Sequence, residues 1–342
     1  MSKPVAAVVP LAAALAVTAA LLALSGAPPV EALRLIAAGA FGGATRVADT
    51  LVAWVPLTIA AVGLVLTFRA RLWNIGVEGQ MIAGAIAAAA VARSVPGGRA
   101  LVLPTVLFAA IAGGALWGWL AGILLVKGRV NEIFGGIGLG FVAQSLATYL
   151  VIGPWKRPGV ASTSGTEPFR PETWLPELGE TRLSWVSLLL ALAALVAIAW
   201  LLRRTRFGLR LLAVGSNPVS ARLLGVPADG TLLRAFLWGG GLAGLAGGIV
   251  LTGLQHKLVP AIAGGRGFLA VLVVLLAGNR MLWVGVVALF FAAISVGSSQ
   301  LQLRLDLDSS LGAVIQGLLV LASVLFAGWR TRRPGHPRNA AA

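Results

Sequence analysis

The chain has 342 residues, of which 58% are hydrophobic and 11% are charged, and its formal net charge is +16. Because a soluble domain carries about 25% charged residues, this composition excludes an ordinary soluble protein and predicts an all-α, polytopic membrane protein. The basic residues lie near the ends of apolar runs, so we attribute the positive charge to membrane topology and expect membrane lipid, and no nucleic acid, as a partner. The sequence has no cysteine, which excludes disulfide bonds and thiolate metal sites.

Apolar runs predict about ten transmembrane helices, with both chain termini in the cytoplasm. The predicted helices comprise residues 4–24, 50–68, 75–92, 101–126, 132–152, 183–202, 232–254, 268–277, 282–299 and 311–329. Most lysines and arginines then fall in cytoplasmic segments and most acidic residues fall outside, as the positive-inside rule requires. The first run is about 20 residues long, which exceeds a typical signal-peptide core and favours a retained helix. An amphipathic piece at residues 30–41 is expected at the membrane interface.

Two segments depart from a simple row of spanning helices. Residues 153–182 form a long polar loop with four glutamates, which we expect on the external side. The predicted helix at 268–277 is too short to cross the membrane, because a crossing takes about 20 residues. It follows a glycine-rich stretch, so we interpret it as half of a discontinuous helix beside a transport path.

The segment 203–226, with the sequence RRTRFGLRLLAVGSNPVSARLLGV, is the most patterned loop of the chain. Asn217 is typical of a helix N-cap, Pro218 suits the first helical position, and Gly225 suits the residue just past the end. The pattern therefore predicts a short helix over 218–224. The arginines before it place the segment in the cytoplasm, where a permease contacts a soluble motor subunit.

The sequence has no P-loop, metal-binding or hydrolytic motif. Its formal G-x-G-x-x-G match at Gly239–Gly244 lies within an apolar run, where glycines four residues apart are expected to allow close helix packing. A phosphate-binding P-loop ends in lysine followed by serine or threonine, whereas the four lysines here are followed by Pro, Gly, Arg and Leu. His256 and His336 are the two histidines, and no H-E-x-x-H motif or carboxylate cluster accompanies them. We therefore expect no cofactor on this chain and no enzymatic activity. If transport is driven by ATP, the ATP and Mg²⁺ must be bound by a separate ATPase chain.

Polar side chains at membrane depth are the candidates for a translocation path or gate. Glu78 and Gln80 begin the third predicted helix, and Asn131 and Glu132 begin the fifth. Ionisable groups in a spanning helix are costly and usually face a cavity or a partner. We expect these four residues to form a gate or its scaffold.

Two of these polar positions, and Gln144 as a further candidate, also have a simpler interpretation. Glu78 would pair with Arg69 or Arg71, which lie at the same end of the membrane. Glu132 would act as an N-terminal cap, because a carboxylate is favourable at the positive end of the helix dipole. Gln144, in the fifth predicted helix, suits an interhelical hydrogen bond as well as the wall of a pore.

The patterned loop resembles the permease subunits of ABC importers for simple sugars and nucleosides, a family that includes ribose permeases. From Thr205 to Gly225 it is similar to the family stretch T-x-x-G-x-x-L-R-A-V-G-x-N-P-x-A-A-x-x-x-G. One departure is that Leu211 and Leu212 stand between the arginine and Ala213. The residues that the resemblance assigns to ATPase coupling are Arg206, Gly208, Arg210, Gly215, Asn217, Pro218, Ala221 and Gly225.

Two further blocks look like the nucleoside branch of the same family. They are NIGVEGQ at Asn74–Gln80 and VNEI at 130–133, and a G-x-G-F stretch is similar to one in the family. With the polar residues above, these blocks give the expected residues of the translocation path or gate. They are Asn74, Glu78, Gln80, Asn131, Glu132, Gln144, Gly265, Gly267 and Phe268.

The resemblance implies a type II-like ABC importer permease, a multi-pass protein of the bacterial plasma (inner) membrane that moves nucleosides or related simple sugars. It implies one transmembrane domain over 1–342, with a cytoplasmic coupling loop at 203–231 and the external loop at 153–182. The implied partners are an ABC ATPase, a second and different permease chain that completes a heterodimer, and an extracytoplasmic solute-binding protein.

Other functions stay open at this point. A branched-chain amino acid or ribose permease would share the fold and the coupling loop. A secondary transporter driven by protons or sodium would need no docking helix. An intramembrane enzyme is disfavoured because no catalytic cluster is present.

Overall fold

The computed structural model describes residues 28–159, 164–278, 280–305, 308, 310–318 and 320–321. These residues form an almost entirely helical protein, in which the β-structure consists of two isolated bridges. The predicted first helix at 4–24 lies outside the described residues. The predicted tenth helix is described as far as residue 321, where residues 311–318 and 320–321 are helical.

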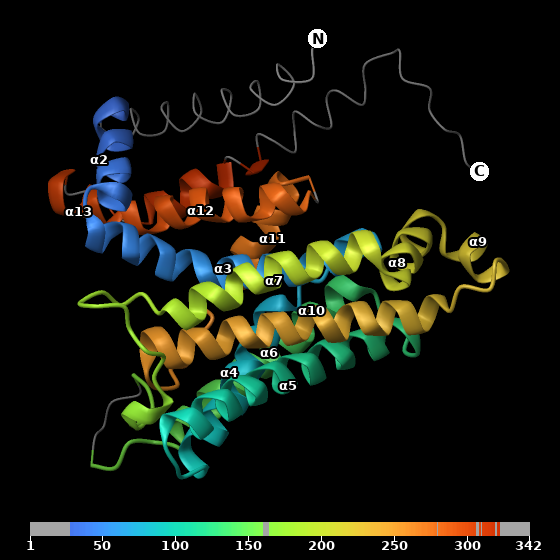
Figure 1. Ribbon diagram of the computed structural model, residues 1–342, viewed down its shortest axis with the longest axis horizontal. Helices are drawn as coiled ribbons and strands as arrows, with labels where there is room; N and C mark the ends of the chain where they lie inside the picture. Colours follow the sequence, from blue (N-terminus) through green and yellow to red (C-terminus); the bar gives the residue numbers. More distant parts are fainter. Residues whose placement is uncertain are drawn as a thin grey trace. The chain divides into compact units, whose positions relative to one another are not determined.

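Twelve α-helices with complete bounds follow one another along the described part of the chain, ahead of the helical residues 311–318 and 320–321 (Figure 1). They are α2 (Pro29–Phe41), α3 (Ala44–Arg69), α4 (Val77–Ser94), α5 (Arg99–Val126), α6 (Glu132–Ile152), α7 (Trp185–Arg204), α8 (Arg206–Ser216), α9 (Pro218–Leu223), α10 (Ala228–Val250), α11 (Arg266–Leu276), α12 (Met281–Gly297) and α13 (Ser299–Leu305). A short 3₁₀-helix, η1 (Pro171–Thr173), lies in the long loop, and a π-helical turn, η2 (Leu251–Gln255), extends α10.

The predicted count of ten spanning helices is not confirmed. Among the described residues, six helices are long and apolar enough to cross a membrane, namely α3, α5, α6, α7, α10 with its π-turn, and α12 continued into α13. The helix α4 is not among them, because Glu78 and Gln80 in its first turn and Arg93 in its last turn lower its apolar character. The helix α11 has 11 residues, which agrees with the prediction that it is too short to span alone.

Two helices appear where the sequence predicted none. The helix α8 occupies the first half of the patterned loop, ahead of the helix predicted at 218–224. The helix α13 follows the span predicted at 282–299. Both are short, and α8 buries Leu211 and Val214 whereas α13 buries Leu301, so packing contributes to their structure.

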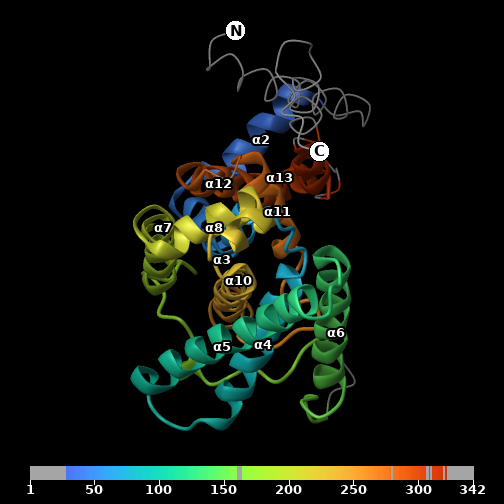
Figure 2. The same cartoon turned by 90° about the vertical axis from the view of Figure 1, so that its right-hand side faces the viewer.

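Residues Ala48–Leu289 form one compact unit with α10 at its centre. The helix α10 is largely buried and packs along α5 and α4, as Figures 1 and 2 show. A Cβ added to Gly244 would come within 2.7 Å of the Gly114 Cα, so the backbones of α10 and α5 touch. The glycines four residues apart in α10 thus permit close helix packing, as their spacing predicts.

The helices α5, α6 and α7 expose much of their apolar surface, in contrast to α3 and α10. Exposed apolar residues on α6 include Phe134, Phe141 and Tyr149. An apolar face without protein neighbours is expected for a helix that contacts lipid. The unit therefore has buried helices inside and lipid-compatible helices outside.

The described residues before and after this unit form a second compact unit. Its core contains Ala32 and Ile36 from α2, Ile294 from α12, Leu301 from α13 and Ile315. The segment 30–41 lies within the helix α2, and its expected place at the membrane interface stays a prediction.

The long loop crosses the segment between α10 and α11. The Thr166 amide donates to the Leu258 carbonyl at 2.9 Å, and the Phe169 amide donates to the His256 carbonyl at 2.8 Å. The Leu175 amide donates to the Thr252 carbonyl at 3.1 Å. These bonds fix the loop against the end of α10 and the approach to α11.

Candidate functional site

The start of α11 is the best-defined polar site in the unit. Gly264 and Gly265 have φ angles of +57° and +76°, in the left-handed region that glycine adopts without strain. They turn the chain sharply, so α11 begins at Arg266 with its first amides unpaired by the helix itself.

The carboxylate of Glu78 pairs with these amides. The Gly265 amide donates to Oε1 at 2.8 Å, and the Gly267 amide donates to Oε2 at 2.7 Å. A carboxylate at the positive end of the helix dipole is favourable, and two hydrogen bonds replace the water that it loses on burial. Glu78, on α4, therefore caps α11, which lies 187 residues further along the chain.

Gly267 brings the two helices into direct backbone contact. A Cβ at this position would lie 2.6 Å from Glu78 Oε2 and 2.7 Å from Glu78 Cα, so a larger residue would push α11 off α4. The alternative ion pair of Glu78 with Arg69 or Arg71 is not found. In the described part of the chain, the salt bridge joins Arg222 to Asp229 instead.

Asn74 and Gln80 form a closed amide pair beside this cap. The Asn74 Nδ2 donates to Gln80 Oε1 at 3.1 Å, and the Gln80 Nε2 donates to Asn74 Oδ1 at 3.0 Å. Both side chains are buried, with 1% and 0% of their surfaces exposed. Each amide satisfies the other, so the pair fixes the turn before α4.

The helix α6 completes the cluster. A Cβ on Gly79 would come within 2.8 Å of the Gly140 Cα, so α4 and α6 are also in backbone contact. The Gln144 Nε2 donates to the Pro260 carbonyl, which ties α6 to the segment that leads into α11. Phe268, in the first turn of α11, leaves 52% of its surface exposed.

Asn131 and Glu132 lie elsewhere. Asn131 caps its own helix, because its Oδ1 accepts from the Ile133 amide at 3.0 Å. Glu132 accepts a long hydrogen bond of 3.5 Å from the Trp73 amide. Both residues line an open cavity of about 770 Å³ together with Pro218 and Arg222 of α9, so the structure places them beside the patterned loop.

The patterned loop folds into two capped helices. The Thr205 hydroxyl accepts from the Gly208 amide at 3.3 Å at the start of α8, and Asn217 Oδ1 accepts from the amides of Val219 and Ser220, both at 3.0 Å, at the start of α9. The predicted cap at Asn217 is confirmed, and Gly225, with φ +77°, follows the end of α9.

The same loop is anchored on the unit through buried contacts. Ala221 packs with Val214 of α8 and Ala228 of α10 in a small apolar cluster. A Cβ on Gly215 would collide with the Arg69 carbonyl, so α8 lies directly against the end of α3. Among the other residues assigned to coupling, Gly208 is buried, Arg210 is partly buried and Arg206 is exposed.

Comparison with known proteins decides the family. Residues 46–324 match a family described as the branched-chain amino acid transport system permease component. The chain is 33% identical over 94% of its length to the glucose ABC transporter permease protein TsgB13 of Haloferax volcanii, 87% of which is covered. The chain belongs to this family of ABC transporter permeases.

Further relatives of the permease include the guanosine ABC transporter permease protein NupP of Bacillus subtilis, at 26% identity over 90% of this chain and 89% of NupP. The nucleoside ABC transporter permease protein NupB of Lactococcus lactis is 28% identical over 76% of this chain and 74% of NupB. The predicted resemblance to sugar and nucleoside permeases is confirmed. The permease is a multi-pass transport component and not an enzyme.

Three features of the permease were missed by sequence reasoning. One is the capping of α11 by Glu78, because no sequence pattern relates Glu78 to Gly265, which is 187 residues away. Another is the Arg222–Asp229 ion pair across the end of α9, at 2.6 Å. The third is α8, whose start was signalled by Thr205 three residues before Gly208.

A metal site is not among the features of the permease that the structure reveals. In the described ranges, no group of three or more histidine, aspartate or glutamate residues is placed to hold a metal ion. The carboxylate of Glu78 is occupied by two amides, so it serves helix packing.

Proposed function

We propose that this permease is the membrane subunit of an importer that moves a sugar-containing solute, a nucleoside or a simple sugar, across a bacterial plasma membrane. The names of long-matching relatives support the solute class, because they give glucose, guanosine and nucleosides as the solutes of those proteins. Glucose and guanosine share a polyhydroxylated sugar ring. Leucine-like solutes are the second candidate, because the family description names branched-chain amino acids.

The observation that carries the coupling half of this proposal is the exposed apolar side of α9. Val219 and Leu223 of this six-residue helix leave 62% and 84% of their surfaces exposed, and Leu224, which caps its end, leaves 83% exposed. Surface leucines that are open to this degree, on a doubly hydrogen-bonded cap, suit a protein partner. The partner is an ABC ATPase, which docks on residues 203–231 and carries ATP and Mg²⁺.

The buried side of the same loop supports transmission of force into the membrane unit. Ala221 and Val214 attach α9 and α8 to α10, and Gly215 attaches α8 to the end of α3. Motion of the docked ATPase would therefore reach α3 and α10 without a flexible joint. Asn131 and Glu132, which share a cavity with Pro218 and Arg222, belong to this coupling region.

The gate half of the proposal rests on the Glu78 cap. The helix α11 is half the length of a spanning helix, and its start is held by Glu78, Gly267 and the left-handed Gly265. Such broken helices line solute paths in transporters. We propose that α4 and α11 move as one body during alternating access, with Phe268 facing the path.

The proposed importer has two further partners, a solute-binding protein and a second permease chain. A solute-binding protein docks on the external loop 153–182, which lies over the approach to α11. A second permease chain completes a heterodimer. Relatives from the same organism occur in pairs, such as TsgB13 with TsgC13 and NupP with NupQ, and this pairing supports two different chains. One transmembrane domain over 1–342 provides all these surfaces.

The solute class is tested by uptake in cells with and without this chain. Labelled guanosine, glucose, ribose and leucine are supplied separately, and each is then competed with an unlabelled excess of the others. We expect chain-dependent uptake of guanosine or of a sugar, unaffected by leucine. Leucine uptake that requires the chain would show that the proposed sugar-containing solute is wrong, whereas the proposed role as a permease would stand.

A further inference from the structure

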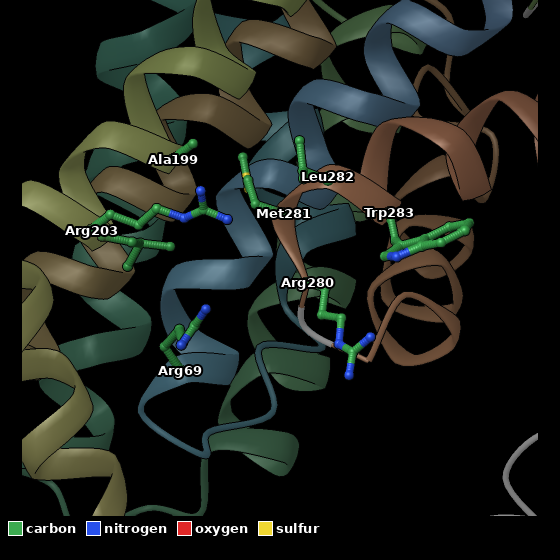
Figure 3. A pocket seen from close by; sticks show the side chains of 8 residues that line it. Arg69, Ala199, Arg203, Arg280, Met281, Leu282 and Trp283 are labelled. Atoms are coloured by element: carbon green, nitrogen blue, oxygen red, sulfur yellow. The ribbon is translucent and has the colours of Figure 1, made fainter. Parts of the chain in front are cut away.

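A cavity beside the end of α3 holds three arginines and no acidic residue. Its volume is about 320 Å³, and it is lined by Arg69 at the end of α3, Arg203 at the end of α7 and Arg280 just before α12. Figure 3 shows the three side chains on three separate elements, with the Arg280 guanidinium pointing away from those of Arg69 and Arg203. The cavity lies outside the Glu78 site and outside the exposed side of α9.

The three guanidinium groups lack a protein counter-charge. In the described part of the chain, the ion pair is Arg222 with Asp229, so no carboxylate neutralises Arg69, Arg203 or Arg280. The Nε of Arg69 is buried and has no hydrogen-bond partner. Arginines that serve topology alone extend into water, where every donor is hydrated. A buried, unpaired donor within a cluster of like charges instead indicates a missing anion.

The other walls of the cavity are apolar. Ala199 and Leu202 come from α7, and Met281, Leu282 and Trp283 come from the first turn of α12. Leu282 and Trp283 leave 78% and 54% of their surfaces exposed, so the apolar wall continues outwards. A tryptophan beside basic residues at a helix end is typical of the membrane interface, where phospholipid headgroups lie.

We propose that Arg69, Arg203 and Arg280 bind a phosphate group. The planar guanidinium fork matches the oxygens of a phosphate, and arginines from three elements line the one cavity in which the anion would lie. The phosphate belongs either to an anionic phospholipid, whose acyl chains would lie along Leu282 and Trp283, or to free phosphate. The bound group joins the ends of α3, α7 and α12 next to α8, which contacts the Arg69 carbonyl through Gly215.

Binding is tested on the purified full-length chain by native mass spectrometry. Phosphatidylglycerol and phosphatidylcholine with identical acyl chains are added separately, because they differ in net charge and not in hydrophobicity. We expect one phosphatidylglycerol to be retained at least about fivefold more strongly, since each basic residue near a headgroup contributes about a fivefold gain. Excess inorganic phosphate distinguishes the source, because it displaces the lipid if a free phosphate can fill the site and leaves it bound if the acyl chains are needed.

Variants locate the bound lipid. Arg203→Gln and Arg280→Gln should each weaken phosphatidylglycerol retention by about fivefold. Arg204→Gln is the matched control, because Arg204 adjoins Arg203 on the same helix and is exposed as Arg203 is, but does not line the cavity. Equal retention of the two lipids by the unaltered chain, or equal weakening by Arg203→Gln and Arg204→Gln, would overturn the proposal. Transport is not measured, so the outcome is independent of the proposed import function.

Discussion

Glu78 explains how a carboxylate can be placed inside a membrane protein without an ion pair. Its two oxygens accept from the Gly265 and Gly267 amides at 2.8 and 2.7 Å, so the charge is solvated by the start of α11. The arrangement uses donors that α11 cannot satisfy itself. A single residue thereby satisfies its own charge and joins two helices.

Replacing Glu78 by glutamine is expected to loosen this joint. The amide keeps one acceptor oxygen, but its NH₂ group faces a backbone amide that is then left unpaired. One buried unpaired donor costs about 1–3 kcal/mol, so thermal unfolding should occur at a lower temperature and solute uptake should fall. Differential scanning fluorimetry of the purified chain and an uptake assay measure the two effects.

Glu132→Gln is the matched control for this substitution. Glu132 also begins a helix, but its hydrogen bond is long, at 3.5 Å, and it lies away from α11. We expect its unfolding temperature to stay near that of the unaltered chain. The account of the cap would be wrong if Glu78→Gln unfolded and transported like the unaltered chain.

His256 gives the molecule a pH dependence on the side of the long loop. Its ring stacks on Trp174, with centroids 4.2 Å apart, and burial lowers the pKa of His256 below its usual value. The nearby charges act in opposite directions, since Glu177 raises this pKa and Arg182 lowers it. Because the folded protein disfavours the protonated ring, the unfolded chain takes up the proton first as the pH falls below about 6.5.

The stabilising contribution of neutral His256 is therefore present above about pH 6.5 and is lost as the pH falls through the lowered folded pKa. We expect the unfolding temperature of the unaltered chain to drop more between neutral and mildly acid pH than that of His256→Gln. His336 is present in both proteins, so it cancels in the comparison. Parallel pH profiles for the two proteins would refute this role of His256.

At the scale of elements, short-range patterns predicted local structure well and contacts between distant segments poorly. Asn217, Pro218 and Gly225 predicted α9 because caps depend on neighbouring residues. The helix α8 was not predicted, because its buried side depends on a contact that the sequence does not show, the packing of Gly215 against the end of α3. The polar candidates likewise separated into an α4–α11 cluster and a loop-side pair, Asn131 and Glu132, which sequence spacing alone did not distinguish.

The exposed apolar side of α9 is expected to act in docking and not in folding. Leu223→Ser removes a side chain that is 84% exposed, so the unfolding temperature should remain within about 1 °C while ATPase association falls. Asn217→Ala removes two cap hydrogen bonds, and a lost cap costs about 0.5–2 kcal/mol. This substitution should therefore lower both the unfolding temperature and ATPase association. Co-purification of the ATPase with each variant measures docking.

Val30→Ser is a control of similar exposure on another helix. Val30 lies on α2 and leaves 81% of its surface exposed, and it is far in sequence from residues 203–231. It should leave ATPase association unchanged. If Leu223→Ser also co-purified normally with the ATPase, α9 would not be the docking element.

At the scale of the whole molecule, composition predicted a helical membrane protein, and family motifs predicted the permease. The count of ten spans was not confirmed: α4 and α11 fall short of an ordinary spanning helix, the predicted first helix lies outside the described residues, and the predicted tenth is described only as far as residue 321. The buried α10 and the exposed α5, α6 and α7 are alike in hydropathy, so the sequence alone did not indicate which helices lie inside.

The central claim is that a separate ATPase drives solute movement through this chain. The most direct test measures uptake of labelled guanosine and glucose in cells that contain the chain with its partners, before and after ATP depletion, while the membrane ion gradients are maintained. The account predicts uptake that requires the chain and stops when ATP is depleted. Uptake that continues at the same rate without ATP would contradict it and indicate an ion-driven transporter.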